Sequence, residues 1–157
     1  MTRVIVENST ELYYWWSSTL PQVTEGDSTV KKILLVEDES DLINILDLVI
    51  SDEGYEVTQT HSAEEALQFC ETTVPDLVVS DIKMGAMDGL AMFEQLRATP
   101  KFERVPFIFI SAVSDGQWKA KAKSLGAAEF FTKPFDVDEV VGAIKQVLTE
   151  TENAQPA

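Results

Sequence analysis

The sequence predicts an α/β fold in which helices cover both faces of an open, doubly wound parallel sheet of five strands. Short, continuously apolar runs alternate along the chain with segments whose apolar residues recur about every 3.6 residues. The clearest runs are residues 33–36, 77–79 and 107–110. Continuous apolarity is typical of central parallel strands buried on both faces, and their crossover connections are right-handed.

Two weaker runs complete the predicted sheet. Residues 56–60 are more polar than the central runs and suit an edge strand. Residues 128–132 follow Gly126, which predicts the end of a helix, and they lead into Pro134. The ligand site of such a sheet is expected beyond the carboxyl ends of its strands.

Helical patterns lie between these runs. The first has an apolar face formed by Leu42, Ile43, Ile45, Leu46, Val49 and Ile50, and Gly54 ends it. In the second, Ser62 and Glu65 predict a capping box, with an inward face of Ala63, Ala66, Leu67 and Cys70. The last begins at Asp136 and Glu139, which complement the helix dipole, and has an apolar stripe of Val137, Val140, Val141, Ile144, Val147 and Leu148.

Composition excludes several classes of function. The 157 residues include 27 acidic and 12 basic side chains, a formal charge of -15. This charge repels nucleic-acid backbones and anionic membrane surfaces, so we expect no direct binding to either. No apolar run is long enough to span a bilayer. A single cysteine, Cys70, cannot form an internal disulfide, and we expect a cytoplasmic protein.

Polar residues follow four of the predicted strands. They are Glu37 and Asp38, Asp81, Ser111 and Lys133, and all are expected at one rim of the sheet. Clustered carboxylates repel one another unless a cation compensates, and Mg²⁺ prefers such oxygen ligands. A carboxylate can also attack a phosphoryl group, whose charge an ammonium and a hydroxyl help to neutralise.

Four segments together resemble the response-regulator receiver family of two-component signalling. They are Leu34-Leu35-Val36-Glu37-Asp38; Val79-Ser80-Asp81-Ile82-Lys83-Met84 with Met87-Asp88-Gly89; Ile110-Ser111-Ala112; and Phe130-Phe131-Thr132-Lys133-Pro134-Phe135. The resemblance covers residues 31 to about 150. It implies a flavodoxin-like (βα)5 fold with strand order 2-1-3-4-5.

The resemblance also implies a role for each site residue. Asp81 is expected to be the phosphorylated aspartate, with Lys133 as the phosphate-binding lysine. The implied Mg²⁺ ligands are Glu37, Asp38, Asp81 and the backbone carbonyl of Lys83. Ser111 and Phe130 are expected to act as the switch hydroxyl and the switch aromatic.

A sensor histidine kinase or a histidine phosphotransfer protein is the implied donor. A downstream protein would read the surface formed by the fourth helix, the fifth strand and the fifth helix. We expect a signalling protein that catalyses only its own phosphotransfer and dephosphorylation, rather than a metabolic enzyme. Two departures stand out: Gly85 replaces a proline common in the family, and Lys83 and Val113 occupy positions where the family tunes phosphoryl lifetime.

The chain is expected to divide into an extension at residues 1–30, a receiver at 31–150 and a polar tail at 151–157. Too few residues follow Glu150 for an output domain, which predicts a stand-alone receiver. The extension contains Tyr13-Tyr14-Trp15-Trp16, an aromatic cluster that suits packing on the receiver, homodimerisation or partner binding. A plain extension is the simpler alternative.

Other functions and other sites stay open. A phosphate-independent interaction module is one alternative, and an aspartate-nucleophile phosphatase of the haloacid-dehalogenase type is another, although Lys83 replaces the second aspartate of the latter. Lys119, Lys121 and Lys123 beside Trp118 suit either a solvated face or an acidic partner. His61 is expected to be structural or solvated, and Cys70 to be a small core residue.

Overall fold

The computed structural model describes residues 30–112 and 116–154. The predictions for the aromatic cluster at residues 13–16 and for Val113 lie outside this part of the chain. The strands are β1 (Lys32–Val36), β2 (Glu56–Thr60), β3 (Leu77–Ser80), β4 (Phe107–Ser111) and β5 (Glu129–Thr132). The helices are α2 (Ser40–Asp52), α3 (Ala63–Cys70), α4 (Gly89–Arg97), α5 (Gly116–Ser124), α6 (Val137–Ala154) and the short 3₁₀ helix η1 (Pro100–Phe102).

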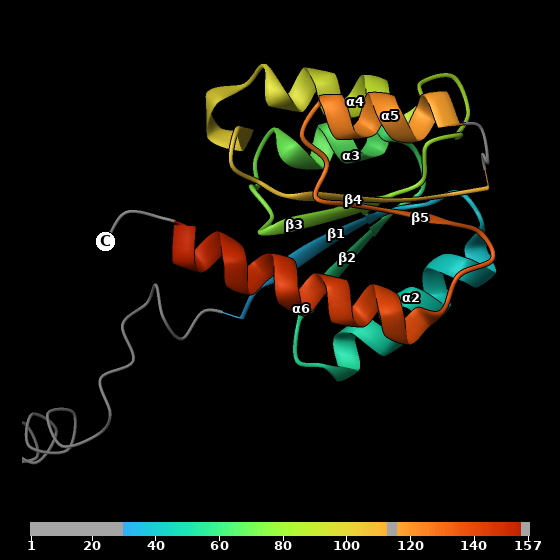
Figure 1. The fold of residues 1–157 in the computed structure, drawn as a ribbon, viewed down its shortest axis with the longest axis vertical. Coiled ribbons are helices and arrows are strands. Elements are labelled where there is room, and N and C mark those ends of the chain that lie inside the picture. Colours follow the sequence, from blue (N-terminus) through green and yellow to red (C-terminus); the bar gives the residue numbers. More distant parts are fainter. Residues whose placement is uncertain (1–29, 113–115, 155–157) are drawn as a thin grey trace, which may run out of the picture. The chain divides into compact units, whose positions relative to one another are not determined.

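The five strands form one parallel sheet in the order β2-β1-β3-β4-β5. Figure 1 shows this sheet lying between two layers of helices. The predicted fold class and the strand order implied by the resemblance are therefore confirmed. The apolar strands β3 and β4 are fully buried, whereas the edge strands β2 and β5 are partly exposed. This difference follows from position, because a central strand has neighbours on both sides and helices above and below.

Two cores lie on opposite faces of the sheet (Figure 1). Helices α3, α4 and α5 cover one face, and α2 and α6 cover the other. On the first face, Phe93 stacks on Phe107 with ring centroids 4.4 Å apart. The Arg97 guanidinium lies over both rings and donates to the carbonyl oxygens of Phe102 and Val105, each at 2.7 Å. Arg97 thereby fixes η1 to α4.

Helix α2 buries a narrower face than the sequence predicts. Ile43, Leu46 and Ile50 are buried, but Ile45 is 50% exposed. Helical residues advance by about 100° each, so Ile45 lies well away from the direction shared by the three buried residues. Placing Ile45 on the inward face was wrong.

Helix α3 begins as predicted, with one adjustment. The Ser62 hydroxyl accepts a hydrogen bond from the Glu65 N–H at 3.0 Å. The Glu65 carboxylate reaches back to the N–H of His61, at 3.3 Å, instead of that of Ser62. The capping box therefore includes the exposed His61 backbone.

Helix α6 continues into the predicted polar tail. It runs from Val137 through Ala154, so residues 151–154 of the predicted polar tail are helical. Thr151 continues the helix with a hydroxyl bond to the Val147 carbonyl at 2.8 Å. In the described part of the chain, no helix combines the length and apolarity needed to cross a membrane.

Cys70 is a core residue, as expected, and is 2% exposed. Burial raises the pKa of its thiol from 9.0 to about 11. At pH 8 the folded chain should therefore contain about 100-fold less thiolate than a thiol of unshifted pKa. We expect slow modification of the native chain by Ellman's reagent and fast modification in urea; equal rates would show that Cys70 is accessible.

Gly89 lies where a side chain has no room. A Cβ atom there would fall 2.1 Å from the Asp81 carbonyl oxygen, which is backbone and cannot move aside cheaply. We expect Gly89→Ala to lower the free energy of unfolding by about 1–3 kcal/mol in urea titrations. Gly142→Ala is the matched control, because Gly142 lies in α6 with nothing within 4 Å of its Cβ position. That change should raise stability by up to about 1 kcal/mol, and two changes of the same sign would contradict the steric argument.

Candidate functional site

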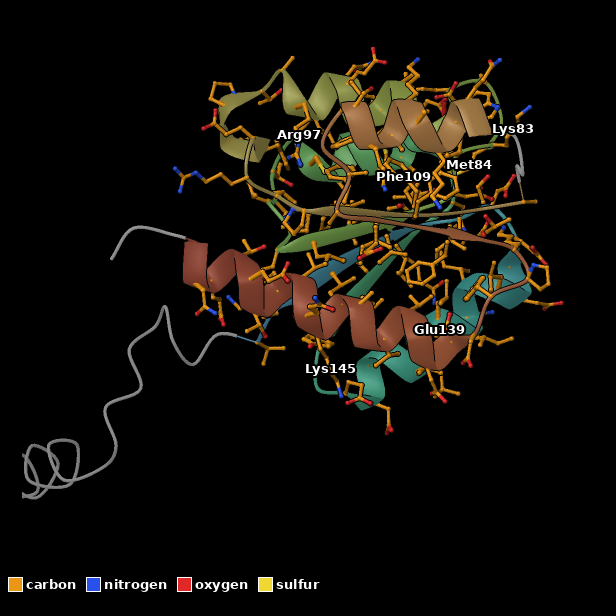
Figure 2. All side chains as sticks on the ribbon, viewed as in Figure 1. Lys83, Met84, Arg97, Phe109, Glu139 and Lys145 are labelled. Atoms are coloured by element: carbon orange, nitrogen blue, oxygen red, sulfur yellow. The ribbon has the colours of Figure 1, made fainter. Side chains whose placement is uncertain are left out.

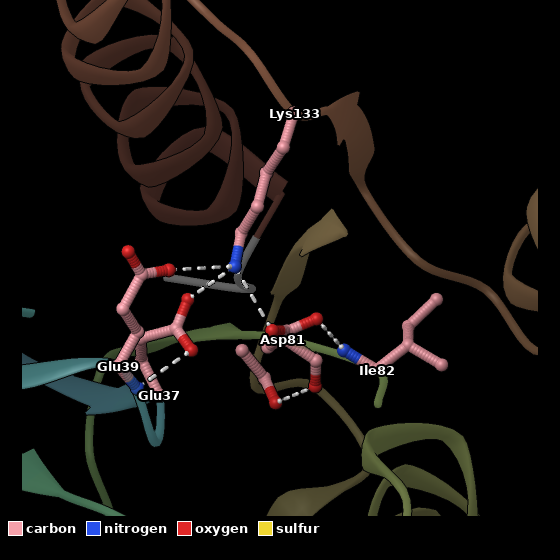
Figure 3. A network of polar contacts seen from close by, with 6 residues as sticks. Glu37, Glu39, Asp81, Ile82 and Lys133 are labelled. Carbon is pink, nitrogen blue, oxygen red and sulfur yellow. Dashed lines mark hydrogen bonds and ion pairs between the residues drawn. The ribbon is translucent and has the colours of Figure 1, made fainter. Parts of the chain in front are cut away.

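The site lies at the carboxyl edge of the sheet, where residues from three loops meet (Figure 3). Glu37 and Asp38 follow β1, Asp81 follows β3, and Lys133 follows β5. Because parallel strands share one direction, their carboxyl ends lie at one edge, and residues up to 96 positions apart come into contact there. The structure therefore brings these four sequence-predicted residues together.

Lys133 is the cation at the centre of this cluster. Its Nζ donates to Glu37 Oε1 at 2.7 Å and to Asp81 Oδ2 at 3.0 Å (Figure 3). Both carboxylates are buried, at 4% and 7% exposure for Glu37 and Asp81 respectively. Lys133 Nζ also lies 3.9 Å from Glu39 Oε2, whose side chain is exposed. One ammonium group thus compensates two buried charges directly and a third at longer range.

Backbone groups fix the position of Asp81. Its Oδ1 accepts a hydrogen bond from the Ile82 N–H at 2.6 Å (Figure 3), and its own N–H donates to the Val36 carbonyl at 2.9 Å. The Ser80 hydroxyl donates to the Asp81 carbonyl at 2.7 Å. The close approach of Gly89 lets α4 begin directly against this segment. Both oxygens of the Asp81 carboxylate therefore accept hydrogen bonds, Oδ1 from the Ile82 N–H and Oδ2 from Lys133 Nζ.

The electrostatics of the cluster follow from burial and crowding. Burial, together with the nearby charge of Asp81, raises the pKa of Glu37 from 4.5 to about 7, against the hydrogen bond from Lys133. For Lys133, burial lowers the pKa, but the hydrogen bonds to Glu37 and Asp81 outweigh it and raise the pKa above its ordinary value. Lys133 therefore stays charged at neutral pH.

The carboxylates also form a set that suits a divalent cation. One oxygen each from Glu37, Asp38 and Asp81 can be chosen so that all three lie within 4.8 Å of one another. Asp38 is exposed and open to solvent, while the other two are buried. Carboxylate oxygens combined with access for water match the preferences of Mg²⁺, which keeps several waters when bound.

The three remaining predicted residues lie on β4, on β5 and in the loop after β3. Ser111 is fully buried at the end of β4, and its carbonyl accepts from the Lys133 N–H at 2.8 Å. Phe130 on β5 is half-buried and packs against the core beneath α3, α4 and α5. Lys83 follows Asp81 by two residues in the loop before α4, and its side chain is exposed. The roles of Ser111, Phe130 and the Lys83 carbonyl stay predictions.

Two contributors were missed by the sequence analysis. Glu39 extends the acidic run Glu37-Asp38 and reaches toward Lys133, a signal present in the sequence but not used. No sequence signal could have identified the Ile82 N–H as a partner of Asp81, because every residue except proline carries the same donor.

The loop after Asp81 departs from the family pattern at Gly85. Gly85 has φ +44°, which proline cannot adopt, so the backbone of this loop takes a conformation that the family's common proline could not take.

A parallel five-stranded sheet in this order, covered by helices on both faces and with carboxylates and a lysine at its carboxyl edge, is a flavodoxin-like α/β fold with a polar site where such folds bind ligands. A family model, the response regulator receiver domain, matches residues 33–145. The chain belongs to the response regulator receiver family. Members of this family are signalling domains of two-component systems that accept phosphoryl groups, bind Mg²⁺ at an acidic pocket, and interact with histidine kinases and downstream targets.

Individual relatives agree with this assignment. The alkaline phosphatase synthesis transcriptional regulatory protein PhoP of Bacillus subtilis is 35% identical over 127 residues, 81% of this chain and 52% of that protein. Sporulation initiation phosphotransferase F of the same organism is 33% identical over 118 residues, 75% of this chain and 94% of that protein. The chain spans about half the length of the first curated relatives that it matches.

Among solved structures, response regulator protein TrrA from Thermotoga maritima was determined in complex with Mg²⁺ and BeF. It is 30% identical, with a TM-score of 0.67, and the match covers 75% of this chain and 99% of that one.

Removing the Lys133 charge should destabilise the metal-free chain. In EDTA, we expect Lys133→Met to lower the free energy of unfolding by about 2 kcal/mol, because two buried carboxylates lose their bridging cation while the aliphatic stem remains. Lys145→Met is the control, since its ion pair with Glu53 at 2.8 Å is exposed, and a much smaller change is expected. Urea denaturation measures both variants, and equal losses would show that the bridge to Glu37 and Asp81 is not special.

Proposed function

We propose that this receiver takes a phosphoryl group onto Asp81 and uses it to switch a protein-binding surface. The arrangement that carries the proposal is the contact of Lys133 Nζ with Asp81 Oδ2 at 3.0 Å beside the Glu37, Asp38 and Asp81 cluster. A buried carboxylate that is positioned from both oxygens and faces an ammonium is prepared to receive an anionic group.

The transfer forms a P–O bond to an Asp81 carboxylate oxygen while the P–N bond of a phosphohistidine breaks, and the leaving imidazole takes up a proton. Lys133 neutralises charge on the phosphoryl oxygens, and the Ser111 hydroxyl donates to one of them. Glu37, Asp38, Asp81 and the Lys83 carbonyl would hold Mg²⁺, and the bound ion would neutralise further phosphoryl charge. Hydrolysis later reverses the modification: water attacks phosphorus, the P–O bond to Asp81 breaks, and inorganic phosphate leaves.

The switch begins at the ends of β4 and β5. The hydrogen bond from the Lys133 N–H to the Ser111 carbonyl joins these strand ends, so a shift of Ser111 toward the phosphoryl group pulls on both. Phe130 moves further inward into the space that Ser111 leaves, and the surface of α5, β5 and α6 changes with it. A small local shift becomes a discrete change because packed cores are bistable.

The phosphoryl donor is a sensor histidine kinase or a histidine phosphotransfer protein in the cytoplasm, and the output is another protein. The relative named as a phosphotransferase supports a relay role, and the relative named as a transcriptional regulator supports a terminal one. Direct nucleic-acid contact is not part of the proposal, since the formal charge is -15.

Intact mass spectrometry after treatment with acetyl phosphate and Mg²⁺ tests the proposal. The wild type should gain one labile phosphoryl group, the adduct should be absent when the metal is chelated, and Asp81→Asn should gain none. The asparagine variant is a close match in shape, so its failure isolates the carboxylate as nucleophile.

Other outcomes of the same experiment point elsewhere. If the wild type gains no adduct, a phosphate-independent interaction module is favoured. Sustained turnover of phosphate esters by the purified chain would favour a phosphatase of the haloacid-dehalogenase type instead.

A further inference from the structure

A contact between a lysine and a tryptophan joins the loop after Asp81 to helix α5. Lys83 Nζ lies 5.3 Å from the ring centroid of Trp118, within the range of a cation–π interaction. Figure 2 labels Lys83 beside the start of α5. Trp118 lies in the first turn of that helix, so the contact connects the proposed phosphorylation loop to a helix of the proposed output surface.

Burial of its two neighbours fixes the backbone position of Lys83. Ile82 and Met84, on either side of Lys83, are 0% and 4% exposed, so the chain is anchored before and after a side chain that points to solvent. Trp118 is half-buried and packs against the core on this face. The contact can therefore break by rotation of the lysine side chain alone, without movement of the loop.

Helix α5 is well suited to respond to such a contact. Among the described residues of α5, only Ala122 is buried, so few core contacts hold this helix. A second surface link, from Lys121 to Glu94 of α4 at 3.3 Å, has both side chains about half exposed and contributes little. Elements with few buried contacts are the ones that shift at low free-energy cost.

Two groups can attract the Lys83 ammonium: the Trp118 ring, and a phosphoryl group on Asp81. Two residues span at most about 7 Å of backbone, and the lysine side chain adds a flexible four-carbon stem, so the ammonium can approach a group on Asp81. A phosphoryl group brings about two negative charges to that position. An exposed cation–π contact is weak enough for such an anion to compete with it.

We propose that Trp118 is a positioning residue that holds the Lys83 ammonium away from Asp81 until phosphorylation, and that the phosphoryl group then competes for it. This inference rests on the proposed function, because it needs phosphate on Asp81. Trp118 then has two effects. When the phosphoryl group draws Lys83 away from Trp118, the lost contact changes the environment of α5 and so reports phosphorylation. While Trp118 keeps hold of Lys83, the lysine is not paired with the phosphoryl group, and the lifetime of the phosphoryl group is shorter. The second effect arises because a lysine paired with the phosphoryl oxygens obstructs the attacking water.

Fluorescence of Trp118 tests the first effect. Trp15→Phe and Trp16→Phe in the full chain leave Trp118 as the only tryptophan. Acetyl phosphate with Mg²⁺ should change its emission, measured per fraction of chain carrying the mass adduct. Lys83→Met should reduce this change and leave only the part that comes from the movement of α5 through Ser111 and Phe130. Lys83→Arg should retain the full change, because arginine keeps the cation.

A matched control separates this contact from a general loss of charge. Lys101 Nζ lies 5.4 Å from the Phe102 ring centroid, a contact of similar length between an exposed lysine and a buried aromatic ring. It lies on η1, before β4 and thus toward the opposite edge of the sheet. Lys101→Met should leave the phosphorylation-linked change in Trp118 emission intact.

Decay of the adduct after removal of acetyl phosphate tests the second effect. Trp118→Leu should lengthen the phosphoryl lifetime about two- to fivefold, which is the factor that corresponds to the free energy of an exposed cation–π contact. Trp118→Phe should stay near wild type, because it keeps an aromatic face. In combination with Lys83→Met, Trp118→Leu should have no further effect.

Two results would overturn the inference while leaving the proposed function intact. One is an adduct-linked change in Trp118 emission that is as large in Lys83→Met as in the wild type. The other is a lifetime effect of Trp118→Leu that is the same with and without Lys83→Met, since Trp118 would then act by packing alone. Absence of any adduct on the wild type would overturn the proposed function and this inference together.

Discussion

The burial of two carboxylates beside one another is the constraint around which the site is built. Glu37 and Asp81 are nearly inaccessible to solvent, and each accepts a hydrogen bond from the same Lys133 ammonium. Without a cation, such a pair would have to give up charge or unfold. Because Lys133 comes from the last strand, the site is complete only when the sheet has formed from β1 through to β5.

The parallel sheet makes this arrangement reproducible. Backbone hydrogen bonds tie the strand ends to one another: Asp81 bonds to Val36, and Lys133 bonds to Ser111. The distances between the strand ends are thus set by the backbone, and side chains complete a geometry that already exists. Gly89 belongs to the same frame, because only a residue without Cβ lets α4 approach the Asp81 carbonyl so closely.

The strongest elements of the fold could be predicted because their signals are local. Continuous apolar runs gave the central strands, and Ser62 with Glu65 gave the start of α3. The error at Ile45 arose because the helical periodicity is ambiguous there. Ile45 is apolar and close to the helical repeat, yet it points to solvent. The polar composition after Glu150 suggested a tail, whereas α6 continues because polar residues are acceptable on an exposed helix face.

The sequence by itself determined the class of fold, the edge at which chemistry is possible, and which carboxylates, lysine and hydroxyl follow the strands. These properties depend on periodicity and on the order of residues along one chain. Only the tertiary structure decided that Lys133 bridges Glu37 and Asp81, that Glu39 approaches it, and that Lys83 rests over Trp118. Those contacts join residues far apart in the chain or depend on the rotamer of a flexible side chain, and neither distance nor rotamer leaves a local signal.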